Sequence, residues 1–148
     1  MAQTTGQVSS KDFKIETSVD GAAWEDQSGV AFTIDPGDQM RATGARHTFD
    51  GNTPLTTSGK LEARTLKVEF AYTEGASDLY ADVLAAQINN TAFYIRWHPK
   101  GGQTNEFKFT TAAGTVSKLT DPKGDADSGA PVVCAFELFT AGVTKGTN

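Results

Sequence analysis

The chain has 148 residues, the usual length of one domain, and we expect a single domain over residues 1–148. Its 18 acidic against 13 basic residues give a net charge of −5, which excludes a surface built to grip nucleic acid, since such surfaces need clustered Lys and Arg. The single cysteine excludes an intrachain disulfide, and no apolar stretch approaches the roughly 20 residues of a membrane helix.

A β-hairpin is predicted over residues 15–34. Two runs of alternating apolar residues, 13–18 and 30–34, flank Asp20-Gly21, and glycine supplies the positive φ that a two-residue turn needs. Every second residue of each run is expected to face the core: Phe13, Ile15, Thr17, Val30, Phe32 and Ile34.

Trp24 follows this turn and is followed by Glu25 and Asp26, in the stretch "DGAAWED". Three interpretations are open for a tryptophan in this place. It is a platform for a ligand, a plug for the open end of a barrel, or an anchor for a neighbouring subunit.

The next segment predicts a turn, a weak strand and a long loop. Pro36-Gly37 is turn chemistry, and residues 38–47 form the weak strand. Residues 48–59 are rich in Gly, Asn, Pro, Thr and Ser, and a loop of this length is uncommon and usually functional. It is either a mobile hairpin tip or an arm that folds onto a neighbour. The candidate inter-subunit residues on it are Phe49, Asp50 and Leu55.

The strongest strand and the one helix follow. Residues 60–73 alternate, with Leu66, Val68, Phe70 and Tyr72 on the inward face. Residues 77–90 predict a helix with Ser77 as N-cap and Asn89-Asn90 at its end. Its apolar stripe is Leu79, Tyr80, Val83, Leu84 and Ile88.

The β pattern resumes at residue 91. The run 91–99 points Phe93, Ile95 and Trp97 inward, and Tyr94, Arg96 and His98 outward. Further strands are expected over 105–111, where Phe107 and Phe109 face inward, and over 114–120. A polar loop covers 121–130.

The closing strand 131–141 is apolar on both faces. Cys134 lies on one of them with Val132, Phe136 and Leu138, and is interpreted as a buried small hydrophobe. Val133, Ala135 and Phe139 make the other face almost as apolar, so the strand should be covered on both sides, by the helix or by another chain. Residues 142–148 are expected to fray as a C-terminal tail.

These elements predict an all-β fold with one helix, a β-sandwich or partly open barrel of about eight strands. Nothing in the sequence supports catalysis, so no enzyme is expected, and neither is a cofactor or a metal. His47 and His98 are far apart and are expected at the surface or at an interface. The run "DPKGDADSG" lacks the acid six residues beyond the glycine that a calcium loop requires.

In their order along the chain, the parts resemble the major tail proteins (tail tube proteins) of long, non-contractile-tailed bacteriophages. The stretch "SVDGAAWEDQSG", residues 18–29, carries this resemblance most closely, and the polar N-terminal arm (1–11), long loop, helix and closing strands follow the same plan. The resemblance implies hexameric rings that stack into a hollow tube, with neighbouring sheets joined edge to edge around a lumen.

The same resemblance implies the protein's partners and place. These are further copies of itself, the tail terminator and tail-tip proteins, and the tape-measure protein and DNA that pass through the lumen without tight binding. The location is then the tail of the virion, assembled in the host cytoplasm. An acidic wall would keep DNA from sticking, and the lumen-facing candidates are Glu62, Glu69 and Glu106.

Two alternatives remain open. One is another tail or baseplate ring component, or a tail terminator, built on the same fold. The other is a small β-sandwich carbohydrate-binding module with stacking surfaces at Trp24, Tyr94 and Trp97, although alternation along the strand points Trp97 inward.

Overall fold

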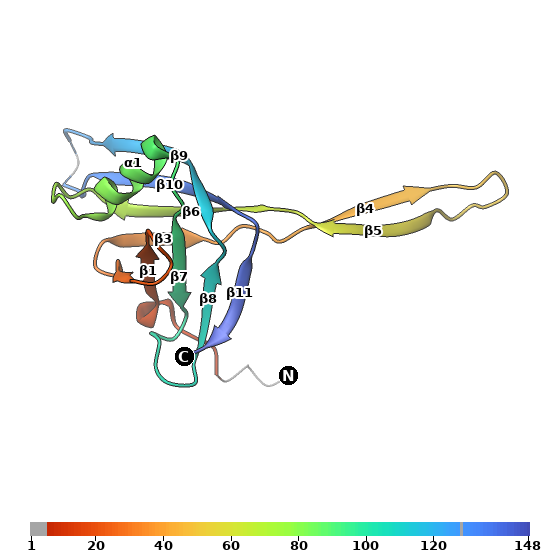
Figure 1. The fold of residues 1–148 in the computed structure, drawn as a ribbon, viewed down its shortest axis with the longest axis horizontal. Helices are drawn as coiled ribbons and strands as arrows, with labels where there is room; N and C mark the ends of the chain where they lie inside the picture. Colours follow the sequence, from red (N-terminus) through yellow and green to blue (C-terminus); the bar gives the residue numbers. More distant parts are fainter. Residues whose placement is uncertain (1–5, 128) are drawn as a thin grey trace.

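A computed structural model describes residues 6–127 and 129–148. Within these residues the chain forms eleven strands, one α-helix and one short 3₁₀-helix, as a body of two sheets from which a two-stranded arm projects (Figure 1). The predicted all-β class with one helix is confirmed, and the sheets do not close into a barrel. The elements are η1 (Ser10–Asp12), β1 (Lys14–Ser18), β2 (Glu25–Asp26), β3 (Ala31–Asp35), β4 (Arg41–Arg46), β5 (Leu55–Leu61), β6 (Arg64–Ala71), α1 (Leu79–Asn89), β7 (Tyr94–His98), β8 (Phe107–Thr111), β9 (Gly114–Lys123), β10 (Val133–Thr140) and β11 (Val143–Thr147).

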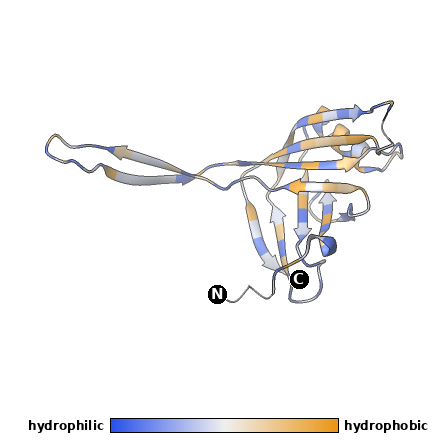
Figure 2. Cartoon of the chain, turned by 180° about the vertical axis from the view of Figure 1, so that it is seen from behind, coloured by the Kyte–Doolittle hydropathy of each residue, from blue (hydrophilic) through white to orange (hydrophobic). Residues whose placement is uncertain are grey.

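The body consists of two antiparallel sheets. One has five strands in the order β11-β8-β7-β1-β2, and the other has four in the order β3-β6-β10-β9. In Figure 1 the strands β1 and β7 run across the direction of β6 and β10, as in sheet pairs that pack crosswise. Figure 2 shows the hydrophobic segments gathered in these body strands, whereas the middle of each arm strand is coloured pale, which marks intermediate hydropathy.

The core lies between the two sheets and under the helix. The residues predicted to face inward on β6, β7 and β10 are buried: Leu66, Val68, Phe70, Phe93, Ile95, Trp97, Cys134, Phe136 and Leu138. The ring of Phe136 meets those of Phe70 and Phe93 edge to face, with centroids 6.0 and 5.7 Å apart. Alternation therefore identified most of the core, but Val132 and Phe107, which were also predicted to face inward, are 38% and 53% exposed.

The helix begins later than predicted. Asp78, not Ser77, is the N-cap, and Asn90 ends the helix in the left-handed region with φ 50°. Leu79, Val83 and Ala86 are its buried residues, which are spaced four and three apart along one face. Ile88 was predicted on the buried stripe, but it is exposed because it lies five residues beyond Val83 and so faces away from the core.

The predicted two-residue hairpin at Asp20-Gly21 is wrong. β1 pairs with the two-residue strand β2 across a wider loop, and β3 joins the other sheet as a partner of β6. Side chains shape this loop, because the hydroxyl of Ser18 accepts from the amide of Gly21 at 2.8 Å and the carboxylate of Asp20 accepts from Ala22 and Ala23 at 2.8 and 2.9 Å. These bonds compete with a tight turn.

Phe32 was predicted to face inward, but its side chain is 51% exposed. The register of β3 on β6 shifts between Ala31 and Thr33, and this irregularity turns Phe32 out of the core. Val30 and Ile34, the other two residues predicted to face inward here, are half-buried against the core.

Both ends of the chain differ from expectation. The tail predicted to fray from residue 142 forms β11, which pairs with β8 from Val143↔Thr111 to Thr147↔Phe107. The loop predicted over 121–130 begins later, because β9 continues to Lys123 beside Val133. Of the N-terminal arm predicted over 1–11, residues 1–5 lie outside the described residues, and the last two belong to η1.

Two phenylalanines of β10 test the assignment of its faces. Phe136→Ala removes a fully buried ring and is expected to lower the free energy of unfolding by about 3–5 kcal/mol, measured by urea denaturation. Phe139→Ala, on the opposite face of the same strand, is the matched control and should change the monomer's stability by less than about 0.5 kcal/mol. Equal losses would contradict the assignment.

Candidate assembly surfaces

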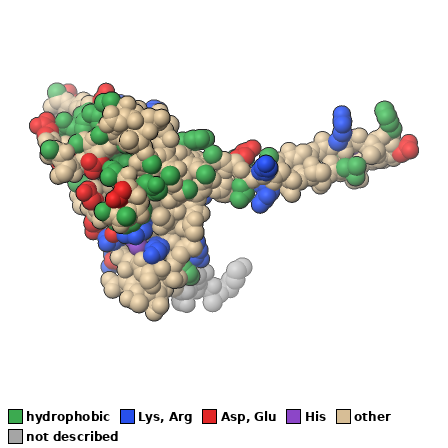
Figure 3. All heavy atoms as spheres, in the orientation of Figure 1, with side chains coloured by type: hydrophobic (Ala, Val, Ile, Leu, Met, Phe, Trp, Pro, Cys, Tyr) green, Lys and Arg blue, Asp and Glu red, His purple; other side chains and the backbone are tan. Residues whose placement is uncertain are grey.

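The arm is a two-stranded antiparallel sheet of its own, made of β4 and β5. The loop predicted over 48–59 is therefore partly wrong, since its second half begins β5, with Leu55 opposite Arg46 and Thr57 opposite Gly44. The threonine-rich sequence was predicted as a loop, but threonine side chains are β-branched and favour a strand when a partner strand is present. Figure 3 shows the arm as a narrow rod that stands clear of the body.

The base of the arm is held firmly. The guanidinium of Arg64 donates to the carbonyl oxygens of Pro36 at 2.9 Å and Gly37 at 3.3 Å, and the amide of Glu62 donates to the carbonyl of Met40 at 2.9 Å. Gly37 has φ 63°, and a Cβ there would lie 2.2 Å from the carbonyl oxygen of Thr65, so only glycine fits. The direction of the arm is thus set where it leaves the body.

Beyond its base the arm has only its own ladder of hydrogen bonds. Residues 38–63 are exposed apart from Gly51. Phe49 and Asp50 lie in the tip, and the side chain of Phe49 is 111% exposed relative to its reference state. An isolated two-stranded hairpin is marginally stable in water, so an arm with this composition suits contact with another surface. The structure places Phe49, Asp50 and Leu55 together on it.

The outer face of the four-stranded sheet is also open. It carries Lys67 and Glu69, two residues apart on β6 with their charged atoms 3.4 Å apart, and Lys118 of β9 facing Glu137 of β10 at 3.9 Å. Phe139 lies on the same face and is 51% exposed. Within the single chain the helix and the five-stranded sheet cover only the inner face of β10, so cover of its other face by another chain stays a prediction.

The sheets of the body end in strands with one free edge. Within the described residues β3 pairs only with β6, and β9 pairs with β10 and, through a single bridge at its first residue Gly114, with Phe93. Exposed strand edges present unpaired backbone donors and acceptors that favour joining to another strand. The four-stranded sheet therefore offers two such edges, one on each side.

The three candidate lumen residues do not share one face. Glu69 lies on the outer face of the four-stranded sheet, and Glu62 lies at the base of the arm. Glu106 precedes β8 in the other sheet, where its carboxylate accepts from the amide of Gln103 at 3.0 Å. Of the three, only Glu69 sits among the charges of the open sheet face.

A buried ion cluster joins β1 to β7 and was not predicted. The carboxylate of Glu16 lies 2.6 Å from Nε of Arg96, 2.9 Å from Nζ of Lys14 and 2.9 Å from Nε2 of His98. His98 was expected at the surface or at an interface, but its side chain is buried within the chain and only 4% exposed. The amide of Asn148 contacts Nδ1 of His98 at 3.2 Å, which leaves Nε2 free to donate to the carboxylate.

The cluster controls the charge of Glu16. Burial opposes ionisation of this carboxyl, but hydrogen bonds from Arg96, Lys14 and His98 outweigh it and lower the pKa of Glu16 to about 2. Alternation along the two strands predicted that Glu16 and Arg96 are charged residues on outward faces. It could not predict their contact, because they are 80 residues apart in sequence and only the pairing of β1 with β7 brings them together.

Trp24 packs against the Glu16 cluster through Arg96. The guanidinium carbon of Arg96 lies 4.2 Å from the centroid of the Trp24 ring, so one cation is shared between the indole and the Glu16 carboxylate. Trp97 is buried and stacks on Phe109 at 5.5 Å. The aromatic residues proposed for sugar stacking therefore do not form one exposed platform.

The described residues show little that points to chemistry at a site. Among them no group of three or more His, Cys, Asp or Glu side chains is placed to hold a metal ion. No helix in the described part has the length and apolar content needed to cross a membrane. His47 is exposed on the arm, and Cys134 is buried with its pKa raised by burial.

No model of a known protein family matches the sequence, and no curated protein matches it. Solved structures do share its fold. A chain of the tube-terminating cap of the anti-feeding prophage matches with TM-score 0.73 and 18% identity, over 100% of this chain and 96% of that one. A chain of the PVC sheath–tube complex of an extracellular contractile injection system matches with TM-score 0.71 and 16% identity, over 92% and 88%. The SPP1 tail tube matches with TM-score 0.66 and 15% identity, over 96% and 80%.

These likenesses extend over nearly the whole chain and confirm the resemblance to tail tube proteins at the level of the fold. They also include a chain of a sheath/tube terminator, with TM-score 0.71 and 14% identity. The fold is therefore shared with proteins of tubes and of tube ends.

The ion cluster makes stability depend on acid. The pKa of Glu16 in the folded protein is below its ordinary value of 4.5. Its contribution to the free energy of unfolding is therefore full above pH 4.5 and is lost as the pH falls toward 2. Unfolding free energy, measured by denaturant titration from pH 7 to 2.5, should lose at most about 3 kcal/mol through this group.

Glu16→Gln should be less stable than the parent at pH 7, and the difference should shrink as the pH falls from 5 to 2.5. Glu106→Gln, whose carboxylate lies in an exposed turn, is the matched control. A Glu16→Gln variant that keeps the full acid dependence would contradict the assignment.

Proposed function

We propose that this protein is a structural subunit of a viral tail tube, which assembles from identical copies into stacked hexameric rings around a lumen. The observation that carries the proposal is the tail-tube fold, matched over nearly the whole chain, together with an arm that lacks any body contact beyond its base. Such an arm adds nothing to a solitary domain. It is explained if a neighbouring copy receives it.

The free sheet edges support ring formation. Neighbouring strands in the order β3-β6-β10-β9 are all antiparallel, so the two edge strands run in opposite directions. β9 of one copy can then meet β3 of the next copy in the same antiparallel sense as every other pair. Repeating this contact closes the sheet around an axis and hides every edge of it.

In this arrangement the outer face of the four-stranded sheet lines the lumen, with Glu69 and Glu137 among its charges. DNA and the tape-measure protein would pass through without tight binding, because Lys67 and Lys118 on this face each lie beside a glutamate and leave no cluster of unpaired cations for a polyanion. Tail terminator and tail-tip proteins would close the two ends. The role is that of a virion structural protein and not of an enzyme.

A second candidate is a ring that caps or terminates a tube. It is favoured by the likeness to the anti-feeding prophage cap and to the sheath/tube terminator, which match this chain about as well as the tube proteins do. The two candidates differ in their products. A tube subunit stacks without limit, whereas a terminator forms one ring and stops.

Replacing the arm tests the tube proposal. A variant in which residues 42–60 are replaced by Asn-Gly, between the paired residues Arg41 and Leu61, should fold but fail to polymerise. The parent at high concentration should form tubes of uniform width in negative-stain micrographs. The control is the thermal unfolding of the two proteins, which should differ by only a few degrees. Tubes of normal width from the shortened chain would contradict the role of the arm.

The position of the lumen is testable by labelling. In assembled tubes a cysteine at Glu69→Cys should be shielded from a maleimide coupled to a large polymer, since that reagent cannot enter the lumen. Glu106→Cys, in the other sheet, should react as it does in dilute protein, and buried Cys134 of the parent is the blank. If the Glu69→Cys tubes react fully, the assigned lumen face is wrong.

A further inference from the structure

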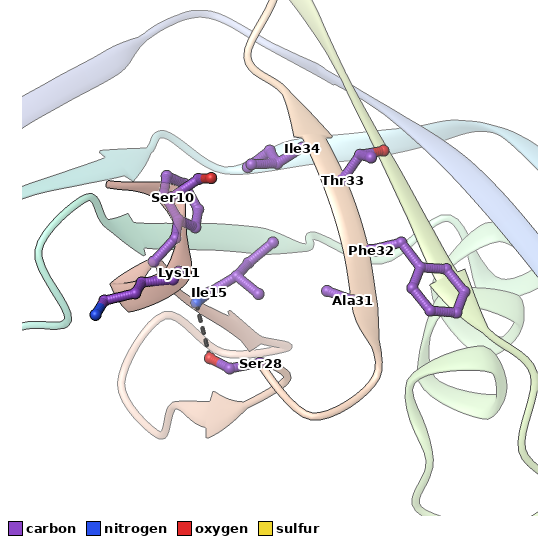
Figure 4. Close-up of a pocket in the computed structure, with 9 residues that line it drawn as sticks. Ser10, Lys11, Ile15, Ser28, Ala31, Phe32, Thr33 and Ile34 are labelled. Atoms are coloured by element: carbon purple, nitrogen blue, oxygen red, sulfur yellow. Dashed lines mark hydrogen bonds between the residues drawn. The ribbon is translucent and has the colours of Figure 1, made fainter. Parts of the chain in front are cut away.

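An open groove with both apolar and polar lining residues lies between η1, β1 and the edge strand β3. Its volume is about 490 Å³, and its lining includes Phe13, Ile15, Ala31 and Ile34, with Lys11 on its rim. In Figure 4 the side chains of Ile15 and Ile34 point into the space between the strands, and the Lys11 side chain extends at its border. Phe13, Ala31 and Ile34 pack on the core but remain partly exposed here.

Two other hollows on the described surface have no aromatic side chain in their lining. The one on the outer sheet face, about 540 Å³, is lined both by charged side chains, among them Lys67 and Asp125, and by apolar ones, among them Val132 and Val133. The one along the arm is lined only by small or polar arm residues, 43–45 and 56–58. The groove beside β3 is the one that combines aromatic and branched aliphatic side chains.

The tip of the arm carries a complementary group. Phe49 is fully exposed, and an aromatic side chain gains most when it enters a desolvated pocket. The tip lies at the far end of the arm from the body, about 30 Å along the strand from Met40 by strand geometry (Figure 1). It therefore cannot reach the groove of its own chain, but it can reach that of another copy.

Charge is complementary as well. Asp50 follows Phe49 in the tip, and Lys11 stands on the rim of the groove. Neither side chain forms an ion pair with any other described residue. Opposite charges left unpaired on the two surfaces would meet if Phe49 entered the groove, and pairs of this kind fix orientation.

We propose that the Phe49 side chain of one copy inserts into the groove between β1 and β3 of a second copy, with Asp50 beside Lys11. This inference rests on the proposed function, since it names the surface that receives the arm. β3 then has two roles. Its free edge is offered to one neighbour in the ring, and the groove along residues 31–34 on the same side is offered to the arm of another copy.

Cross-linking tests the contact. Equal amounts of a Phe49→Cys chain and a Ser10→Cys chain are assembled together and treated with a short bis-maleimide. Covalent dimers are expected in the assembled fraction, because Ser10 lines the groove. The matched control pairs Thr57→Cys, midway along the arm, with Ser10→Cys and should give none. The parent, with only buried Cys134, is the blank.

Charge reversal gives a second measurement. Lys11→Glu should raise the protein concentration needed for assembly about threefold, and adding Asp50→Lys should restore the parent value. A general effect of Lys11 on folding would not be rescued by a residue at the arm tip. Absence of rescue would overturn the pairing.

The outcomes separate the two proposals. Tubes that form normally but give no Phe49–Ser10 dimers overturn the groove assignment and leave the tube proposal standing. A parent chain that forms no assembly at any concentration overturns the tube proposal, and the groove assignment falls with it. Dimers that form equally in dilute, unassembled protein also overturn the groove assignment.

Discussion

The need of every β-strand to satisfy its backbone donors and acceptors governs this molecule. Inside the body the need is met, since β6, β10, β1, β7 and β8 each have a partner on both sides. It is unmet at the outer edges of β3 and β9, and the arm meets it only within itself. The proposed ring contact joins two of these unpaired edges, so that part of the proposed function follows from the same constraint as the fold.

The fold class and most of the core residues could be predicted from the sequence, because the strands that form the core have one buried face. β6, β7 and β10 each have one face against the core, so alternation in the sequence maps directly onto burial of Leu66, Ile95 and Phe136. The helix was recognisable from its apolar spacing, although its start and its last buried position were misplaced. The tail-tube resemblance rested on the order of these parts, and the structure matches it at the level of the fold.

What sequence reasoning missed depends on contacts between distant segments. Asp20-Gly21 was predicted to form a tight turn, but hydrogen bonds to the side chains of Ser18 and Asp20 stabilise a wider loop. β3 then pairs with β6 in the other sheet. The second half of the presumed loop is strand only because β4 lies beside it. The Glu16 cluster needs β1 next to β7, and no periodicity within either strand reports that pairing.

The arm also has a mechanical consequence. β5 continues into β6 through only two residues, Glu62 and Ala63, so the arm and a central body strand form nearly one line. A pull on the tip would load β6 lengthwise, against its ladders with β3 and β10 at once. Hydrogen bonds loaded in shear share the force, whereas bonds peeled one at a time do not. A chain of such subunits would resist stretching along the strand direction far better than it would resist unzipping.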